Sequence, residues 1–357
     1  MKDLISIMIF YLLNTFVFAQ TKDKIDFFIE NKMKEKRIIG LQLAIVKNGK
    51  IVKTGNYGYA NLQDSILVNQ NTIFTINSIT KAFTGVAIMQ LVEAGKISLQ
   101  DPISKYVDSL PLSWRKVTIR QLASNISGIP NLMDSNAKLI AENAEESWKK
   151  VQTLPNEFEA GEQFSYNQTN YTLLKKAIEK VTGISFEDFV KKHHFEKVGM
   201  KNTTKRGFGD FYDVTYNHAR GYTYFVNGDL TNINPEIFPP ITRTAAGMQS
   251  TATEIASWLI NLQNLQLLKN KESLTEMWTP SRLKNGKTAG FGDLLNGYAI
   301  GWFTVIRKNR PAVASIGGGR SAIFIYPKEQ LSIIVLTNLQ GASPENFIDE
   351  IAKFYFE

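Results

Sequence analysis

The chain of 357 residues contains no cysteine and only three histidines. Without cysteine it has no disulfide, no lipid-modified cysteine and no thiolate ligand for a metal ion. The histidines, His193, His194 and His218, do not form the HExxH pattern of a helical zinc site. The sequence therefore predicts neither a metal nor a cofactor, and a core that is stable without covalent cross-links.

Other familiar patterns are also missing, and two of these absences exclude a class of function. The glycine run at residues 317–319 lacks the GxGxxG or Walker frame that a nucleotide-binding loop requires. A Gly-x-Ser-x-Gly segment is absent, which argues against an α/β-hydrolase. Heptads, internal repeats and low-complexity tracts are absent as well.

The composition is that of an ordinary globular protein, with 43% hydrophobic and 21% charged residues and a formal net charge of +8. A basic surface suits anionic cell-envelope polymers or lipids, and it also serves simple solubility. The lysines and arginines are scattered along the chain rather than clustered. This distribution predicts no nucleic-acid partner.

The first nineteen residues differ from the rest of the chain. An apolar run from Leu4 to Phe18 follows Lys2 and Asp3, and the small residue Ala19 comes next. This pattern is typical of a secretory signal peptide cleaved after about Ala19, and the alternative is a membrane anchor. The run is short for a membrane span, and no second apolar stretch of spanning length follows. We expect a periplasmic or secreted protein of residues 20–357, with no stable membrane span after cleavage.

The two ends of this mature segment mirror each other. Residues 22–37 have the spacing of an amphipathic helix, and a strand at residues 41–46 is followed by Asn48-Gly49, a strong signal for a tight hairpin into a second strand. Three further strands are predicted at residues 298–305, 321–326 and 331–337. A closing helix is predicted over residues 344–356, with inward-facing residues Phe347, Ile348, Ile351 and Phe354.

Strands at both ends of the chain, each near a terminal helix, predict one antiparallel sheet flanked by the N- and C-terminal helices. The long middle of the chain is mostly helix and loop. The expected fold class is therefore α+β, with a sheet subdomain of about residues 22–74 and 281–357. A large, mostly helical insertion of about residues 75–280 forms the second subdomain.

One predicted helix, at residues 78–94, is apolar almost all round, which indicates that it is buried. Ser78 and Lys81 at its start lie on one face, one turn apart. Burial lowers the pKa of a lysine from its usual ~10.4, and a neutral amine can accept a proton from serine. The pair therefore points to a serine hydrolase with Ser78 as nucleophile and no histidine base. Four other Ser-x-x-Lys pairs lie in polar surroundings: Ser113/Lys116, Ser135/Lys138, Ser147/Lys150 and Ser281/Lys284.

The segment Phe-Thr-Ile-Asn-Ser-Ile-Thr-Lys-Ala-Phe-Thr at residues 74–84 resembles the first motif of the serine β-lactamase and penicillin-binding-protein superfamily. It is most similar to the branch of class C β-lactamases, DD-peptidases and esterases. Four later stretches resemble that branch in the same order, at residues 117–130, 164–171, 246–251 and 297–302. The resemblance extends over about residues 22–356 and implies a β-lactamase/transpeptidase-like fold.

The resemblance also implies roles for two residues of the second motif, Tyr-x-Asn. Tyr166 takes the place of a tyrosine that shares protons with the lysine, and the charge of Lys81 would favour its phenolate. Tyr166 would then act as base for Ser78 and as acid for the leaving group, whereas the alternative is a merely packed aromatic ring. Gln168 stands where the family has asparagine. Its longer amide has the same donors and acceptor, and we expect it to orient the lysine and a substrate carbonyl.

The third motif departs further from the family. In place of Lys-Thr-Gly or His-x-Gly the chain has Ser-Ile-Gly-Gly-Gly-Arg at residues 315–320. Ser315 replaces the basic residue in the preferred register, Ile316 replaces it in a register one residue later, and neither is cationic. This change argues against recognition of a substrate carboxylate, although Arg320 is a nearby source of positive charge.

Glycines are retained in the third motif, where they would let a substrate approach the strand backbone closely. Gly317 and Gly318 are the residues concerned. The resemblance implies that the backbone N–H groups of Gly318 and Ser78 form an oxyanion hole.

Together these features predict an exported serine hydrolase that forms an acyl-enzyme on Ser78. Its substrate would be a small ester, an amide or a D-amino-acid peptide, with cell-wall-derived molecules among the candidates. One alternative is a catalytically weak or inactive penicillin-binding-like protein with a ligand-binding role, which the two altered motifs favour. The other is a DD-peptidase or β-lactamase acting on cell-wall peptides or β-lactams.

Overall fold

The computed structural model describes residues 22–136, 138–208, 214–233 and 238–356. The predicted signal peptide, residues 1–19, and its cleavage position lie outside these ranges. Within them, no helix has both the length and the apolar character needed to cross a membrane.

The main sheet joins the two ends of the chain, as predicted. Its antiparallel strands run in the order β3-β2-β1-β12-β11-β10-β9-β8, and β1 pairs with β12 from Leu41↔Thr337 to Lys47↔Leu331. The strands are β1 (Gly40–Lys47), β2 (Lys50–Asn61), β3 (Ile66–Leu67), β8 (Gly297–Tyr298), β9 (Phe303–Val305), β10 (Ala312–Gly317), β11 (Ser321–Tyr326) and β12 (Leu331–Thr337). The predicted hairpin is confirmed, because Asn48 and Gly49 join β1 to β2.

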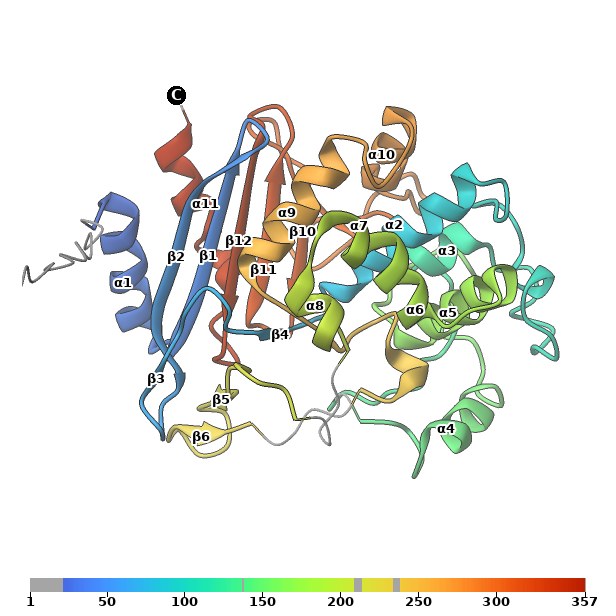
Figure 1. Cartoon of the computed structure of the whole chain (residues 1–357). Helices are drawn as coiled ribbons and strands as arrows, with labels where there is room; N and C mark the ends of the chain where they lie inside the picture. The colour runs from blue at the N-terminus through green and yellow to red at the C-terminus, as the bar shows by residue number, and fades with distance from the viewer. Residues whose placement is uncertain (1–21, 137, 209–213, 234–237, 357) are drawn as a thin grey trace, which may run out of the picture.

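The sheet separates two apolar clusters. Helices α1 (Lys24–Lys36) and α11 (Ile348–Ala352) cover one face, where they contribute to the terminal-helix cluster, and the helical part of the chain covers the other (Figure 1). Strand residues alternate between the faces: Leu43 and Ile45 of β1 contact the terminal-helix cluster, whereas Ala44 and Val46 contact the other. The predicted α+β class is therefore correct.

The chain between β3 and β8 contains most of the helices and two small pairs of strands. Its helices are α2 (Thr80–Glu93), α3 (Ile119–Ala123), α4 (Ala144–Val151), α5 (Gln168–Thr182), α6 (Phe186–Val190), α7 (Glu196–Val198), α8 (Lys201–Arg206), α9 (Ala252–Gln263) and α10 (Lys271–Trp278). The paired strands are β4 (Phe74–Asn77) with β7 (Met248–Ser250), and β5 (Tyr222–Thr223) with β6 (Thr231–Asn232). Strand β4 leads directly toward α2, which is the central helix of this region.

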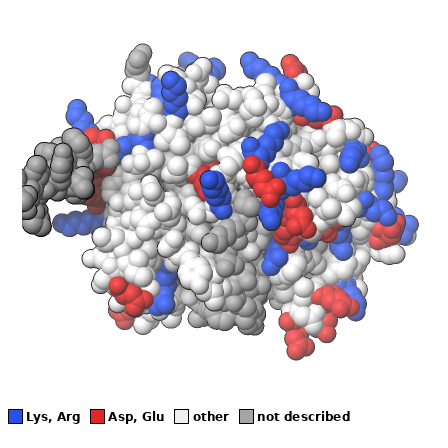
Figure 2. Space-filling view, viewed as in Figure 1, with Lys and Arg blue, Asp and Glu red and all other residues white. Residues whose placement is uncertain are grey.

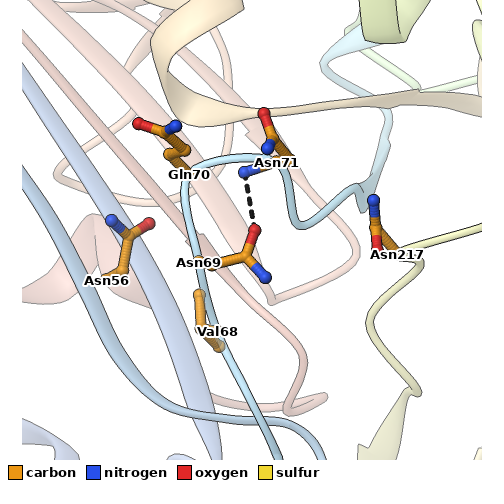
Figure 3. A pocket seen from close by; sticks show the side chains of 6 residues that line it. All are labelled: Asn56, Val68, Asn69, Gln70, Asn71 and Asn217. Carbon is orange, nitrogen blue, oxygen red and sulfur yellow. Dashed lines mark hydrogen bonds between the residues drawn. The ribbon is translucent and has the colours of Figure 1, made fainter.

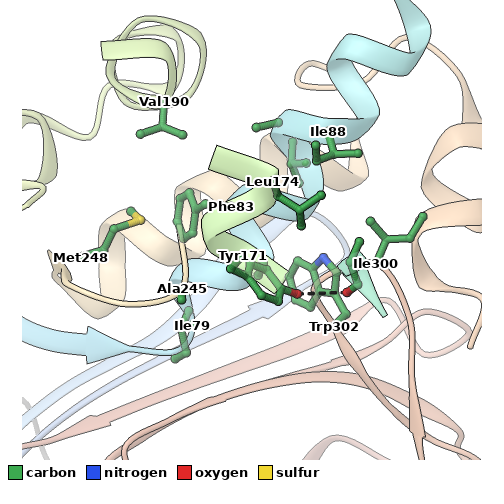
Figure 4. Packing of buried hydrophobic residues seen from close by; sticks show 14 of the residues in the cluster. Ile79, Phe83, Ile88, Tyr171, Leu174, Val190, Ala245, Met248, Ile300 and Trp302 are labelled. Atoms are coloured by element: carbon green, nitrogen blue, oxygen red, sulfur yellow. Dashed lines mark hydrogen bonds between the residues drawn. The ribbon is translucent and has the colours of Figure 1, made fainter. Parts of the chain in front are cut away.

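Helix α2 is buried on all sides, as its sequence predicts. Figure 4 shows Phe83 and Ile88 packed among side chains of α5, such as Leu174, and the segment that precedes β9, such as Trp302. The helix begins at Thr80 rather than at Ser78, so the serine lies in the turn between β4 and α2. A buried helix of this kind gives the residues at its N-terminus a rigid support.

Three predictions about the C-terminal part need correction. Residues 298–305 are not one strand: the chain turns between β8 and β9, where Gly301 lies against the backbone of Lys81 and leaves no room for a side chain. Strand β10 was not among the three strands predicted from the apolar pattern, although the resemblance implied a strand at the third motif. The closing helix is shorter than expected because 3₁₀ turns flank α11, and Phe354 is 44% exposed instead of facing inward.

A histidine buried against α2 makes the stability of this core sensitive to acid. His194 is fully buried, stacks on Phe83 and bonds through Nε2 to Oε1 of Gln90 at 3.0 Å. Burial lowers its pKa from 6.5 to about 3. Above pH 6.5 the imidazole is neutral in both states, whereas below it only the unfolded chain gains the proton. The free energy of unfolding should therefore fall by about 2 kcal/mol between pH 7.5 and pH 5 on account of His194.

Urea unfolding of the wild type and His194→Gln at these two pH values measures that share. The variant should lose about 2 kcal/mol less than the wild type on acidification, within the precision of linear extrapolation. His193→Gln is the matched control, since this neighbouring side chain is less buried. An equal pH dependence in the wild type and the His194 variant would contradict the assignment.

Candidate active site

The predicted nucleophile follows a strained residue. Asn77, the last residue of β4, has φ of +49°, a left-handed conformation that asparagine tolerates better than most residues. The pairing of β4 with β7 is irregular between Thr75 and Asn77. Thr80 Oγ1 donates to the Asn77 carbonyl at 2.6 Å and fixes the turn. Ser78 is left partly exposed at the edge of the helical core.

Lys81 lies beside Ser78 with only 1% of its surface exposed. Its Nζ donates to Oε1 of Gln168 and to the carbonyl of Ala245, both at 2.9 Å, and lies 3.5 Å from Ser78 Oγ. Burial lowers its pKa well below the usual value, as the sequence predicts for a desolvated lysine. A neutral amine has two N–H donors and one lone pair. The two short contacts occupy the donors, so the lone pair is available toward Ser78.

The ring of Tyr166 also lies close to Lys81. Lys81 Nζ is 4.5 Å from the centre of this ring. Phe291 and Phe303 hold the ring, with centroids 5.1 and 5.9 Å away. Burial raises the pKa of Tyr166, and the influence of the Ser78 hydroxyl only partly opposes that rise.

Burial of Tyr166 therefore argues against the expected phenolate in the free protein. Lys81 lies over the face of the Tyr166 ring, and burial favours its neutral form, so it supplies little charge to stabilise an anion. A phenol whose pKa is raised keeps its proton, so Tyr166 is suited to donate or relay one.

Gln168, the first residue of α5, reaches the lysine despite replacing asparagine. Its Oε1 accepts from Lys81 at 2.9 Å, and its backbone N–H donates to Oδ1 of Asn131 at 3.1 Å. Its longer side chain therefore keeps the predicted contact with the lysine. A contact with a substrate carbonyl remains a prediction.

A buried network of amides, which the sequence did not indicate, supports Tyr166 and Gln168. Oδ1 of Asn125 accepts from the backbone N–H of Asn167 at 3.2 Å and from Nδ2 of Asn170 at 3.1 Å. Ser127 Oγ donates to Oδ1 of Asn170 at 2.6 Å. These bonds fasten the loop before residue 130 to the first turn of α5. Their partners are more than 40 residues apart, so no local spacing reveals them.

The structure decides which residue occupies the third-motif position that faces the site. Val313 and Gly317 of β10 lie on the sheet face toward α2, and Ser315 shares that face by the two-residue alternation of a strand. Ile316 packs against the terminal-helix cluster on the opposite face. Ser315 is therefore the residue at the basic position, and it is 3% exposed.

The glycines of this motif serve the protein's own packing. A Cβ on Gly317 would lie 2.1 Å from the Ile76 carbonyl oxygen, and one on Gly318 would lie 2.3 Å from Nδ2 of Asn77. Strand β10 thus approaches the segment before Ser78 more closely than any side chain would permit. Close approach of a substrate to this strand backbone stays a prediction. Gly318 itself is exposed and lies against Asn77, the residue before Ser78, and its role in an oxyanion hole stays a prediction.

Other surface features lie apart from these residues. A depression of about 530 Å³ beside β2 is lined by uncharged side chains and by none of the predicted site residues (Figure 3). They are Asn56, Val68, Asn69, Gln70, Asn71 and Asn217. On the face shown in Figure 2, basic and acidic side chains are intermixed. Among the described residues, no three His, Asp or Glu side chains gather in a way that would hold a metal ion.

Comparisons with known proteins give the family. The family model described as Beta-lactamase matches residues 25–355. The chain is 28% identical over 346 residues to Protein flp of Staphylococcus aureus (strain MW2), covering 93% of this chain and 66% of that protein. It is 26% identical over 318 residues to Penicillin-binding protein 4* of Bacillus subtilis (strain 168), covering 82% and 66%. The chain thus spans slightly less than two thirds of the length of these relatives.

Solved structures of penicillin-binding proteins also resemble this chain. The octameric penicillin-binding protein homologue from Pyrococcus abyssi superposes with a TM-score of 0.76 and 28% identity, over 93% of this chain and 76% of that one. The penicillin-binding protein from Bacillus halodurans gives a TM-score of 0.74 and 25% identity, over 91% and 100%. The predicted family is confirmed: the chain belongs to the β-lactamase family of serine hydrolases, which has penicillin-binding proteins among its homologues.

Proposed function

We propose that the protein is an exported serine hydrolase that forms an acyl-enzyme on Ser78. The observation that carries this proposal is the state of Lys81: buried, with a lowered pKa, two donors engaged at 2.9 Å and Ser78 Oγ at 3.5 Å. A long contact in a free enzyme is compatible with catalysis, since such bonds tighten when substrate binds. Export is supported by the composition of residues 1–19.

The first half-reaction follows from this arrangement. Ser78 Oγ forms a bond to the substrate carbonyl carbon as its proton passes to Nζ of Lys81. The carbonyl electrons move to the oxygen, which the N–H groups of Ser78 and Gly318 stabilise. When the intermediate collapses, the bond to the leaving group breaks. Tyr166 gives that group a proton and takes one from the Lys81 ammonium, so both side chains return to neutrality.

Deacylation uses the same residues with water as the nucleophile. A water molecule loses a proton to Lys81, directly or through the hydroxyl of Tyr166, as its oxygen attacks the acyl carbon. Collapse of the second intermediate breaks the ester bond to Ser78. The proton returns to Ser78 Oγ and the acid product leaves.

The third motif sets the preferred substrate class. Ser315 occupies the basic position and offers a hydroxyl instead of a cation. A substrate carboxylate would meet no positive charge at Ser315. The binding of an uncharged ester or amide does not need that charge. We therefore place small esters and amides first and D-amino-acid peptides second.

A second candidate function is a DD-peptidase or penicillin-binding activity, which the similarity to penicillin-binding proteins of Bacillus subtilis and Bacillus halodurans favours. A third is a binding role with little catalysis, favoured by the non-cationic third motif. Two probes separate these candidates in the protein of residues 20–357. Turnover of p-nitrophenyl acetate without labelling by a fluorescent penicillin supports the esterase. Labelling by penicillin favours the second candidate. If neither ester turnover nor penicillin labelling is observed, the third candidate is favoured.

A further inference from the structure

Asn77, the residue before Ser78, is held at its backbone by Thr80 and at its side chain by Arg320. Asn77 is 4% exposed and left-handed, with its carbonyl bound by Thr80. Because the backbone torsions of Asn77 orient the next peptide, they determine where the N–H of Ser78 points. A non-glycine residue in this region persists only when its surroundings hold it there.

The side chain of Asn77 extends to the turn that joins β10 to β11. It packs against Gly318, where a Cβ would be only 2.3 Å from the nearest atom of the amide group. An amide's orientation is assigned from its hydrogen-bond partners. With Oδ1 of Asn77 directed toward Arg320, it accepts from Nε at 3.3 Å and from Nη2 at 2.5 Å.

Arg320 is itself firmly held at the start of β11. It is 4% exposed, and its carbonyl accepts from both the N–H and Oγ1 of Thr337 at 2.9 Å. Its N–H donates to the Gly317 carbonyl at 3.0 Å. Its Nη1 lies 3.2 Å from where a Cβ of Gly221 would be, so the absence of that side chain leaves space for the guanidinium. The arginine thus belongs to the same rigid turn as Gly318.

We propose that Arg320 is a positioning residue that joins the two halves of the oxyanion hole. Through Asn77 it ties the peptide of Ser78 to the turn that carries the N–H of Gly318. This inference rests on the proposed function, because it concerns the same site. It gives the arginine a role that involves no substrate carboxylate. A shift of about 1 Å between the two donors would slow acylation by about 10²-fold.

A double-mutant cycle tests the tie. Arg320→Met removes the guanidinium, and Asn77→Gly removes the amide while tolerating a positive φ. The readout is the second-order rate constant with which a fluorescent alkyl fluorophosphonate labels Ser78 in the protein of residues 20–357. Arg320→Met should slow labelling by about 10- to 100-fold. In the Asn77→Gly background the same change should cost less than about 3-fold, since coupled residues are not additive. Effects that multiply would overturn the proposal.

Two further variants keep the test interpretable. Arg320→Lys preserves the positive charge but loses the planar guanidinium with its several N–H donors. This variant should fold, and its effect on the labelling rate should still depend on whether Asn77 is present. Arg307→Met removes an arginine paired with Asp349 on the opposite face of the sheet, and it should label at the wild-type rate. An Arg320→Met effect confined to the KM of carboxylate-bearing esters, with unchanged labelling, would also overturn the proposal. It would assign substrate binding instead.

The inference can be judged even if the proposed function fails. A wild type that is neither labelled nor active on p-nitrophenyl acetate would refute the hydrolase assignment. Crystal structures of the wild type and Arg320→Met then decide the question of positioning. Loss of the positive φ at Asn77, or a changed separation of the Ser78 and Gly318 nitrogens, supports the tie. An unchanged turn overturns it.

Discussion

Lys81→Met should lower kcat/KM for p-nitrophenyl acetate by about 10³- to 10⁴-fold, because it removes the group that accepts the Ser78 proton. Methionine fills similar space, but the Gln168 and Ala245 oxygens lose a donor at 2.9 Å. That loss costs about 1–3 kcal/mol of stability, which thermal unfolding would report separately. Lys150→Met is the matched control: it alters another Ser-x-x-Lys pair, whose lysine is exposed, and should leave the rate unchanged. A Lys81 variant within 10-fold of wild type would contradict the proposed base.

The pH profile of the wild type tests the same base in another way. Only the neutral amine accepts a proton, so kcat/KM should rise as pH increases through the pKa of Lys81. Burial places that pKa well below its ordinary value of 10.5. The rate should therefore reach its plateau at a pH where an exposed lysine is still charged. A rate that keeps rising up to pH 10 would show that the lysine is not desolvated in the working enzyme.

Tyr166→Phe should lower kcat/KM by about 10²- to 10³-fold, because it removes the hydroxyl that relays protons while leaving the ring in place. Phenylalanine keeps the packing against Phe291 and Phe303, so stability should change little. The matched control is Tyr171→Phe. The ring of Tyr171 also lies close to Lys81, whose Nζ is 4.9 Å from the ring centre. Its hydroxyl donates to the Ala123 carbonyl at 3.0 Å, away from Ser78.

Steady-state kinetics of both tyrosine variants separate chemistry from packing. The Tyr171 variant should lose about 1 kcal/mol of stability and keep its catalytic rate. If the Tyr166 variant stayed within 3-fold of wild type, its tyrosine would be only a packed aromatic, which is the alternative that the sequence left open.

The sequence was most informative where chemistry depends on local spacing. Ser78 and Lys81 are three residues apart at the start of an apolar helix, and the structure places their Oγ and Nζ 3.5 Å apart. Burial of that helix also predicted the lowered pKa of Lys81. The hairpin at Asn48-Gly49 and the pairing of the chain's two ends likewise followed from short-range patterns.

Features that depend on distant or backbone groups were not predictable. The Ala245 carbonyl accepts from Lys81 across 164 residues, and a carbonyl has no sequence signature. The raised pKa of Tyr166 comes from burial by segments distant in the sequence, such as those of Phe291 and Phe303, which the motif alone does not reveal. Strand β10 is followed by a glycine-rich turn that obscured it, and the contact between Asn77 and Arg320 joins segments from opposite ends of the chain.

The most direct test of the central claim is hydrolysis of p-nitrophenyl acetate by the protein of residues 20–357 beside its Ser78→Ala variant. We expect measurable turnover by the wild type and its loss in the variant, with an acyl group found on Ser78 by mass spectrometry of the quenched wild type. Equal, near-background rates in both proteins, with Ser78 unmodified, would contradict it.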